Sequence, residues 1–581
     1  MKKLLLLPLF LVVTLLAKTQ VITLSPEKPT FTEEVVLTYN AAEGNAGLLD
    51  CDCDIYAHTG LLTAESSHLG DWKNVVADWG ENTDKLQLKK VGDNLYELRF
   101  SISELYGIPA TGGNLTALNF VFRNEKGDKV GKDKGDKDIY YFFQKPSFRT
   151  APATFDESQS NTPEWSKYAS IYEVNVRQYT EEGTFDAFAK HLPRLRELGV
   201  DILWFMPIQP IGDKDRKGTL GSYYSIKDYT AVNPEFGTID DFKRLVNTAH
   251  GMGFKVILDW VANHTSRDNI WIASHANWYN YDDSGNIIAP YDWSDVADLN
   301  YDMYYMRQAM SEAMLFWVQE CDIDGFRCDV AGEVPVDFWN DNRMLLDAEK
   351  DVWMLAEDGS KMYLLNSAFN ANYGWEFHHL MNQVAQGKEP AQSLMDNVKK
   401  MEAAYPKGSY PMHFITNHDE NTWKGTVFDR LGDGHQAFAV LTFTVPGIPL
   451  MYSGQEAGNK KRLEFFEKDA IEWGDFELMP FYSTLNQLKA ENPALWNGNA
   501  GGIFKEIKHN NTENVVAFSR SKDNNEVLTI INCSNKKQQV TLNIEDITGS
   551  YTDYFSGETI RAEAIANMKL DKWQYLVLVK N

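Results

Sequence analysis

Cysteine is scarce in this chain of 581 residues. Only five are present, and only Cys51 and Cys53 stand nearly side by side. This scarcity excludes a disulfide-rich scaffold as the basis of the fold. The spacing of Cys51 and Cys53 leaves a structural pair open, but it does not by itself make a zinc site.

Positive charge is in deficit. The chain has 56 Lys and Arg against 82 Asp and Glu, which gives a formal net charge of −26. Phosphates repel a polyanion of this size, so we expect no nucleic acid and no anionic membrane surface as partner. The balance suits a neutral substrate. Apolar residues at 43% and charged residues at 24% exclude wholesale disorder.

Long apolar runs are missing after the first residues of the chain. Residues 4–16 form an almost unbroken apolar run behind Lys2 and Lys3, shorter than the roughly 20 residues that a membrane helix needs. The pattern is typical of a secretory signal peptide, which we assign to residues 1–20. No later stretch is apolar enough for a membrane helix. We therefore expect an exported protein, periplasmic or extracellular, without membrane insertion.

The rest of the chain shows three blocks with different rhythms. Short apolar runs separated by Gly, Asn and Asp predict a β-sandwich for residues 21–145. Residues 146–163, rich in Pro, Ser and Thr, indicate a linker. Buried strands alternate with amphipathic helices over residues 164–492, which favours a closed (β/α)₈ TIM barrel over an open doubly wound sheet. Residues 493–581 return to a β pattern and predict a C-terminal β-sandwich.

Acidic residues stand where the predicted barrel strands end, and active sites of barrels lie at that edge. Asp329, Glu357 and Asp419 follow three different strands. Glycoside hydrolysis needs two carboxylates at the scissile bond, one as nucleophile or base and one as proton donor. A single acid at a strand end is usually a helix cap or turn residue, so the combination carries the functional interpretation.

The neighbours of these acids suggest which one acts as nucleophile and which as proton donor. Arg327 and Asp329 are two residues apart, so on a strand their side chains face the same way. They form either a structural ion pair or a site in which the guanidinium lowers the carboxyl pKa, as a nucleophile requires. Glu357 follows an apolar run, where burial would raise its pKa, as an acid requires. Asp419 could hold a sugar hydroxyl and stabilise positive charge at the ring carbon.

Four motifs along the central block carry a resemblance to a known family. DWVANH begins at Asp259, GFRCDVAGE at Gly325, LAED at Leu355 and FITNHD at Phe414. In this order they resemble the characteristic regions of the α-amylase family of glycoside hydrolases. The resemblance implies a (β/α)₈ barrel that acts on α-linked glucose polymers, such as starch, or on maltooligosaccharides. It also implies a retaining double displacement without an organic cofactor.

The resemblance assigns roles to single residues. Asp329 matches the nucleophile, Glu357 the general acid/base and Asp419 the acid that stabilises the transition state. Arg327 matches the arginine beside the nucleophile.

Further positions match residues around the sugar being cleaved. His264 and His418 match the histidines that hold its hydroxyls, and Tyr224 matches the tyrosine that stacks under it. Asp259 matches a structural acid. Asn263 matches a calcium-ligand position, although it is equally well a simple loop residue.

The chain also departs from the family pattern. Gly332 and Glu333 stand where many α-amylases carry Lys-His, which puts the calcium site and endo-amylase specificity in question. The insert at about residues 265–302 is short and contains VADLN, closer to branches that cleave oligosaccharides. A neopullulanase- or cyclomaltodextrinase-like activity and an α-glucan transglycosylase therefore stay open, and a non-catalytic glucan-binding protein is a third alternative.

Aromatic residues of the N-terminal block allow two interpretations. Tyr56, Trp72 and Trp79 are either part of the sandwich core or a platform on which a glucan stacks. We expect a glucan-binding or spacer role for this block.

Overall fold

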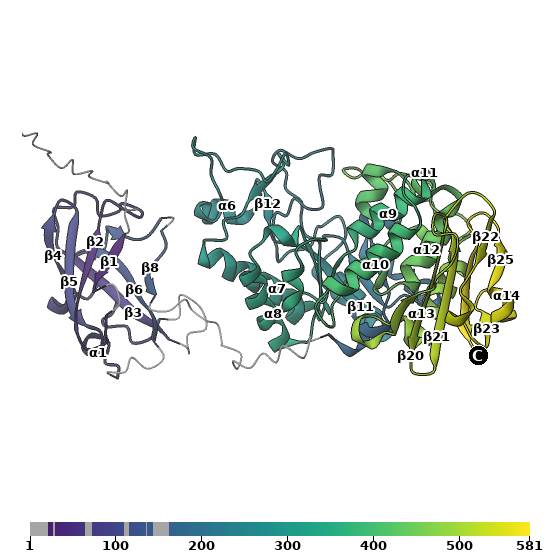
Figure 1. Ribbon diagram of the computed structural model, residues 1–581. Coiled ribbons are helices and arrows are strands. Elements are labelled where there is room, and N and C mark those ends of the chain that lie inside the picture. The colour runs from purple at the N-terminus through teal and green to yellow at the C-terminus, as the bar shows by residue number, and fades with distance from the viewer. Residues whose placement is uncertain (1–20, 27–28, 64–71, 110–114, 135, 143–161) are drawn as a thin grey trace, which may run out of the picture. The chain divides into compact units, whose positions relative to one another are not determined.

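The computed structural model describes residues 21–26, 29–63, 72–109, 115–134, 136–142 and 162–581 (Figure 1). The predicted signal peptide and all but the last two residues of the predicted linker lie outside the described residues. The chain divides into two compact units, residues 1–155 and 156–581. Within the described ranges, no helix has the length and apolar character to cross a membrane.

The first unit is the predicted β-sandwich. Its described strands are β1 (Ile22–Ser25), β2 (Glu34–Asn40), β3 (Ile55–Thr63), β4 (Gln87–Gly92), β5 (Leu95–Ser101), β6 (Leu115–Asn124), β7 (Val130–Gly131) and β8 (Ile139–Phe142). They pair antiparallel in the order β1-β2-β5-β4-β3-β6-β7, with β8 also on β6. Tyr39 of β2 nevertheless stacks on Phe122 of β6, with ring centroids 4.0 Å apart. Since three strands separate β2 from β6, the sheet must fold over its own core.

Cys51 and Cys53 form a disulfide. The structural pair that the sequence left open is thus present, in the segment that leads into β3. The described part of this unit also contains the short helices η1 (Asp84–Leu86) and α1 (Ile102–Tyr106).

The second unit contains a closed barrel of eight parallel strands, as predicted. They are, in order, β9 (Ile171–Val174), β10 (Ile202–Phe205), β11 (Lys255–Val261), β14 (Gly325–Asp329), β15 (Trp353–Ala356), β16 (Ala371–Tyr373), β17 (Tyr410–His413) and β18 (Ile448–Tyr452), which pairs with β9. Both faces are buried: on β10, Ile202 and Trp204 join the inner core, while Leu203 and Phe205 join the outer core under the helices. Continuous apolar strands are typical of such a parallel sheet.

Helices surround the barrel. They are α2 (Val176–Tyr179), α3 (Phe185–Ala189), α4 (Leu192–Leu198), α5 (Ile239–Gly251), α7 (Tyr304–Cys321), α8 (Val336–Glu349), α9 (Trp375–Ala385), α10 (Gln392–Ala404), α11 (Val427–Leu431), α12 (His435–Thr444) and α13 (Met479–Glu491). Thr238 and Asp241 form a capping box that starts α5. The apolar spacing of residues 185–199 predicts one helix, but the chain forms two, α3 and α4, because Pro193 favours a new helix start in the first turn of α4.

Two barrel strands are shorter than their sequence pattern predicts. The apolar run of residues 171–179 predicts one strand, but β9 ends at Val174, because the Asn175 side chain caps α2. The apolar run of residues 412–417 predicts a strand, but β17 ends at His413, and residues 414–417 form the loop that follows. The sixth strand, β16, was not predicted, because three residues show no periodicity.

The predicted insert, residues 265–302, holds β13 (Val296–Asp298), which pairs with β12 (His264–Ser266), and the short helix α6 (Ile270–Ser274). Short helical turns join the elements of this unit: η2 (Glu164–Tyr168), η3 (Ala276–Trp278), η4 (Ala331–Glu333), η5 (Met362–Asn366), the π-helix η6 (Glu420–Lys424), η7 (Gly432–Gly434), η8 (Gln455–Ala457), η9 (Pro493–Leu495), η10 (Gly498–Ala500) and η11 (Ile544–Asp546).

The C-terminal block is a β-sandwich that shares a core with the barrel helices (Figure 1). Its elements are β19 (Ile503–Glu506), β20 (Val515–Lys522), β21 (Asn525–Asn532), β22 (Gln538–Thr541), β23 (Ser550–Asp553), β24 (Thr559–Arg561), α14 (Ala562–Ile565), β25 (Asn567–Leu570) and β26 (Tyr575–Lys580). A six-stranded sheet faces the β22–β25 pair. On β20, Val516 and Phe518 join the barrel-side core, and Val515 and Ala517 join the core of the sandwich.

We predict that Gly325→Ala destabilises the second unit by about 2 kcal/mol or more. Gly325 opens β14 with φ +153°, and an added Cβ would lie 1.9 Å from the Trp353 carbonyl oxygen on β15. Thermal unfolding measures the effect. Gly251→Ala at the end of α5 is the matched control, because its Cβ would meet no atom within 4 Å. Equal melting temperatures for the two variants would contradict the prediction.

Candidate active site

A completely buried arginine, Arg327 of β14, organises the carboxyl-terminal end of the barrel. Its Nη1 lies 2.8 Å from Asp259 Oδ1 and 2.9 Å from Asp329 Oδ1. Its Nη2 forms an ion pair of 2.9 Å with Glu357 Oε1. These carboxylates come from β11, from β14 and from the residue directly after β15. The barrel thus brings three sequence-predicted acids onto one guanidinium, and the expected facing of Arg327 and Asp329 is confirmed.

Aromatic residues enclose the rest of the guanidinium. Arg327 Nε donates a hydrogen bond of 3.0 Å to the Tyr373 hydroxyl on β16. The rings of Trp204, Tyr224 and Tyr373 surround the guanidinium carbon at 5.2, 5.7 and 5.6 Å. Arg327 is therefore fixed from all sides and serves as an internal counter-ion.

Both carboxylate oxygens of Asp259 take part in this network of contacts. Oδ1 faces Arg327, and Oδ2 accepts hydrogen bonds from Trp204 Nε1 at 3.2 Å and from the Tyr224 hydroxyl at 3.0 Å. Such a buried and bonded carboxylate supports its neighbours. This agrees with the structural role that the resemblance implies.

The residue after Asp329 is strained. Val330 has φ +36° and ψ 44°, a left-handed conformation that β-branched residues rarely adopt. In this conformation its backbone N–H donates a hydrogen bond of 2.9 Å to Glu357 Oε2. The turn after β14 thereby links Glu357 to the chain that carries Asp329.

Burial raises the pKa values of both acids. It raises the pKa of Glu357 to about 7, with Asp329 and Asp419 adding to the rise and Arg327 opposing it. This confirms the expectation for Glu357. Burial also raises the pKa of Asp329 to about 6, because it outweighs Arg327, with Asp259 adding to the rise. The expected lowering of the Asp329 pKa is therefore wrong in net direction, although Arg327 does act in the expected sense.

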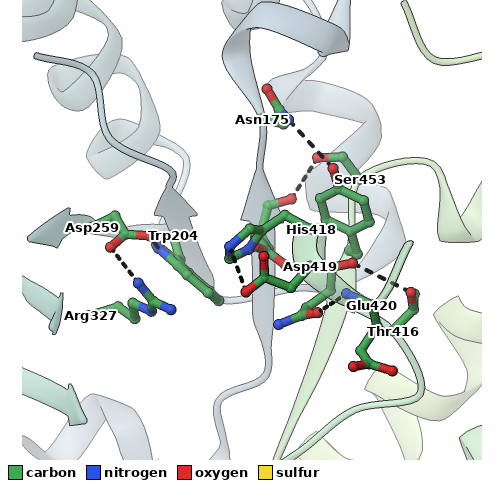
Figure 2. A network of polar contacts seen from close by, with 12 residues as sticks. Asn175, Trp204, Asp259, Arg327, Thr416, His418, Asp419, Glu420 and Ser453 are labelled. Atoms are coloured by element: carbon green, nitrogen blue, oxygen red, sulfur yellow. Dashed lines mark hydrogen bonds and ion pairs between the residues drawn. The ribbon is translucent and has the colours of Figure 1, made fainter. Parts of the chain in front are cut away.

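A second charge pair stands across the site from Arg327. His418 hydrogen-bonds Glu173 Oε1 through Nδ1 at 2.5 Å and the Tyr224 hydroxyl through Nε2 at 2.8 Å. Burial lowers the pKa of His418, but Asp419 and Glu173 raise it to about 9, so the ring is an imidazolium at neutral pH. Figure 2 shows Trp204 between His418 and the Asp259–Arg327 pair.

Asp419 is the most accessible of the three predicted catalytic acids. Its side chain is 37% exposed, against 11% for Asp329 and 14% for Glu357. Its Oδ2 lies 3.4 Å from His418 Nε2. Because its charge raises the pKa of Glu357, it lies within electrostatic reach of that acid. The three acids therefore form one electrostatic cluster at this end of the barrel.

His264, the second predicted histidine, differs from His418 in charge. Burial lowers its pKa to about 4, so the ring is neutral. Its ring packs edge-on against Trp293 of the insert, with centroids 5.4 Å apart. A neutral imidazole both donates and accepts, which suits contact with a hydroxyl group.

The calcium position expected at Asn263 finds little support in its surroundings. The side-chain nitrogen of Asn263 lies 3.4 Å from His264 Nδ1, and the backbone carbonyl of Asn263 accepts a hydrogen bond from the Leu299 N–H. Calcium takes six to eight oxygen ligands, with carboxylates prominent. In the described part of the chain, no group of three or more His, Cys, Asp or Glu side chains could hold a metal ion. Calcium at Asn263 therefore stays a prediction.

A lysine occupies the position next to the family departure at Gly332. Lys361, from the loop after β15, donates a hydrogen bond of 2.6 Å to the Gly332 carbonyl and pairs with Glu333 Oε1 at 3.2 Å. Lys361 was not among the residues predicted from the sequence.

Sequence reasoning also missed Glu173, Trp204 and Tyr373. Glu173 carried the one available signal, because it is the lone acid inside a strand that reads as fully buried. Trp204 looked like an ordinary core residue, and Tyr373 lies on the strand that was not predicted.

Comparisons with known proteins agree with this geometry. The family model "Alpha amylase, catalytic domain" matches residues 150–284 and 275–536, and "Alpha amylase, C-terminal all-beta domain" matches residues 507–572. Alpha-amylase MalA of Haloarcula japonica is 28% identical over 68% of this chain and 60% of its own. The chain thus spans less than two thirds of the length of that relative.

Two further similarities support the assignment. Neopullulanase 2 of Thermoactinomyces vulgaris is 25% identical over 69% of this chain and 76% of its own. The crystal structure of a noncanonic maltogenic alpha-amylase, AmyB from Thermotoga neapolitana, superposes with a TM-score of 0.66 and is 30% identical, covering 71% of this chain and 98% of that one. With the motifs, the barrel and the three acids in place, the chain belongs to the α-amylase family of glycoside hydrolases.

Proposed function

We propose that this protein is an exported hydrolase of α-glucosidic bonds in starch-like α-glucans or maltooligosaccharides, acting with retention. One observation carries the proposal: a single buried guanidinium holds the carboxyls of Asp329 and Glu357 at 2.9 Å each. The shared guanidinium keeps the two acids close together, and the family resemblance favours the retaining geometry, in which the carboxyls are about 5–5.5 Å apart. Export is supported by the N-terminal sequence pattern alone.

In the first step, ionised Asp329 attacks the anomeric carbon while protonated Glu357 gives its proton to the departing glycosidic oxygen. The carbon–oxygen bond breaks and a glycosyl ester forms on Asp329. In the second step, Glu357, now a carboxylate, takes a proton from water, and the water oxygen displaces Asp329. Two inversions restore the α configuration. The higher pKa of Glu357 than of Asp329 supports this division of roles.

The remaining site residues bind the sugar and balance charge. The His418 imidazolium can only donate hydrogen bonds, whereas neutral His264 can donate or accept. Asp419, with its exposed carboxylate, is suited to bind hydroxyls and to favour positive charge at the anomeric carbon in the transition state.

A neopullulanase- or cyclomaltodextrinase-like activity, or glucan transfer, is the alternative. Its support is the short insert, the Gly332–Glu333 departure and relatives named neopullulanase and maltogenic alpha-amylase. A product profile on starch, pullulan and cyclodextrin decides, with and without a chelator. Products longer than the substrate would favour transfer, and inhibition by the chelator would support the calcium prediction.

We predict that Asp329→Asn lowers kcat by about 10⁴-fold or more, because the nucleophile is lost. Binding of a maltooligosaccharide, measured by calorimetry, should persist, since the amide keeps the size of the side chain. Asp283→Asn, on the exposed part of the insert, is the control and should be fully active. A wild-type rate for Asp329→Asn would contradict the assignment.

We predict a bell-shaped dependence of kcat/KM on pH. Activity should rise as Asp329 ionises, near pH 6, and fall as Glu357 loses its proton, near pH 7. The two limbs belong to the coupled pair of acids. An alkaline limb above pH 9 would show that another group than Glu357 supplies the proton.

For the N-terminal sandwich we propose glucan binding through an aromatic cluster of Tyr56, His58, Trp72, Trp79 and Arg123. His58 stacks on Trp72 at 5.6 Å and meets Trp79 edge-on at 5.1 Å. The guanidinium carbon of buried Arg123 lies 5.6 Å from the ring centroid of Tyr56 and 6.0 Å from that of Trp79. Trp79 is 51% exposed, so one large ring is available to a sugar.

We predict that the fragment of residues 21–144, which has its own core, is retained on insoluble starch. Trp79→Ala should lose retention, because the exposed ring is removed. Val91→Ala, which trims an equally exposed apolar residue on β4, should keep it. If the unaltered fragment is not retained, the block is a spacer.

A further inference from the structure

One large aromatic side chain next to the catalytic acids belongs to none of the family motifs. Trp423 lies in the π-helix η6, which begins directly after Asp419. Its Nε1 donates a hydrogen bond of 3.1 Å to Asp419 Oδ1. Even so, the residue is 47% exposed. A π-helix is a rare form that often marks a functional site.

We propose that Trp423 positions Asp419 and stacks on the glucosyl unit that adjoins the one being cleaved. The inference rests on the proposed function and extends it to a residue that the family motifs do not assign.

The positioning role follows from how the three acids are held. Arg327 pairs with Asp329 and Glu357, but its ion pairs in the described structure do not include Asp419. Asp419 is instead held by His418 at Oδ2 and by Trp423 at Oδ1. Trp423 therefore helps to fix the position of Asp419, as Arg327 fixes the positions of Asp329 and Glu357.

The π-helix is braced, so its hydrogen bond to Asp419 has a fixed origin. The Asn421 side chain donates to the Lys461 carbonyl at 3.1 Å and accepts the Leu463 N–H at 2.9 Å. Thr422 donates to the Leu463 carbonyl at 3.0 Å. These bonds tie η6 to the loop after β18.

The stacking role follows from a line of aromatic rings. Tyr224, which lies at the catalytic acids, is parallel to Phe465 with centroids 6.2 Å apart. Phe465 in turn contacts Trp423, with centroids 5.4 Å apart. The line runs from the buried centre of the site to an exposed indole. Glucosyl rings stack on such surfaces, so the next unit of a glucan chain has a place on Trp423.

Two variants separate the roles. Trp423→Phe keeps an aromatic ring but removes the N–H, so kcat should fall about tenfold while KM stays within about twofold. Trp423→Ala removes both, so kcat should fall similarly and KM for maltohexaose should also rise about fivefold. Trp496→Phe is the matched control, since it loses an indole hydrogen bond of 3.1 Å, to the Ala490 carbonyl, and should keep wild-type kinetics. Melting temperatures check folding.

Each outcome is decisive. Wild-type kcat for Trp423→Phe would overturn the positioning role. Equal KM values for Trp423→Ala and Trp423→Phe would overturn the stacking role. A wild-type enzyme without turnover on any α-glucan would instead reject the proposed function, and this result is distinct from active enzyme with unaffected variants.

Discussion

Three carboxylates share one buried guanidinium, and the rest of the site depends on the excess of negative charge that results. Arg327 neutralises one negative charge, while Asp259, Asp329 and Glu357 supply up to three. Ionising all three away from water is costly. Burial first, and the neighbouring negative charges of Asp329 and Asp419 after it, raise the pKa of Glu357 and leave it the proton that a general acid needs. Closure of the barrel creates this arrangement by placing the ends of β11, β14 and β15 side by side.

Glu173 and His418 complete the charge balance on the other side. Glu173 is fully buried on β9, and burial raises its pKa, so His418 is the partner that favours its ionised form. The resulting imidazolium lies beside Asp419 and bonds to the Tyr224 hydroxyl. Tyr224 also bonds to Asp259. The Tyr224 hydroxyl thus joins the Glu173–His418 pair to the carboxylates around Arg327. Tyr224 therefore lies at the centre of the polar network as well as under the predicted sugar position.

The ends of strands were the part of this site that the sequence could predict. Asp329 and Glu357 follow apolar runs, and runs of that kind form barrel strands whose ends meet. Phe465 and Trp423 could not be predicted, because their loops have no periodicity and their packing depends on bonds between distant segments. The predicted direction of the Asp329 pKa shift was wrong for a related reason. A nearby arginine is visible in the sequence, whereas burial and the charge of Asp259 depend on other strands.

The departures at Gly332 and Lys361 are best understood as one change. A Cβ on Gly332 would lie 2.3 Å from Asp358 Oδ2 and 2.9 Å from Lys361 Cδ, so the missing side chain makes room for the lysine stem. The ammonium then reaches the Gly332 carbonyl and Glu333 from the loop after β15. Many α-amylases carry a lysine at the position of Gly332. This chain brings a positive charge to the same turn from the loop after β15, so the departure changes the element that supplies the cation.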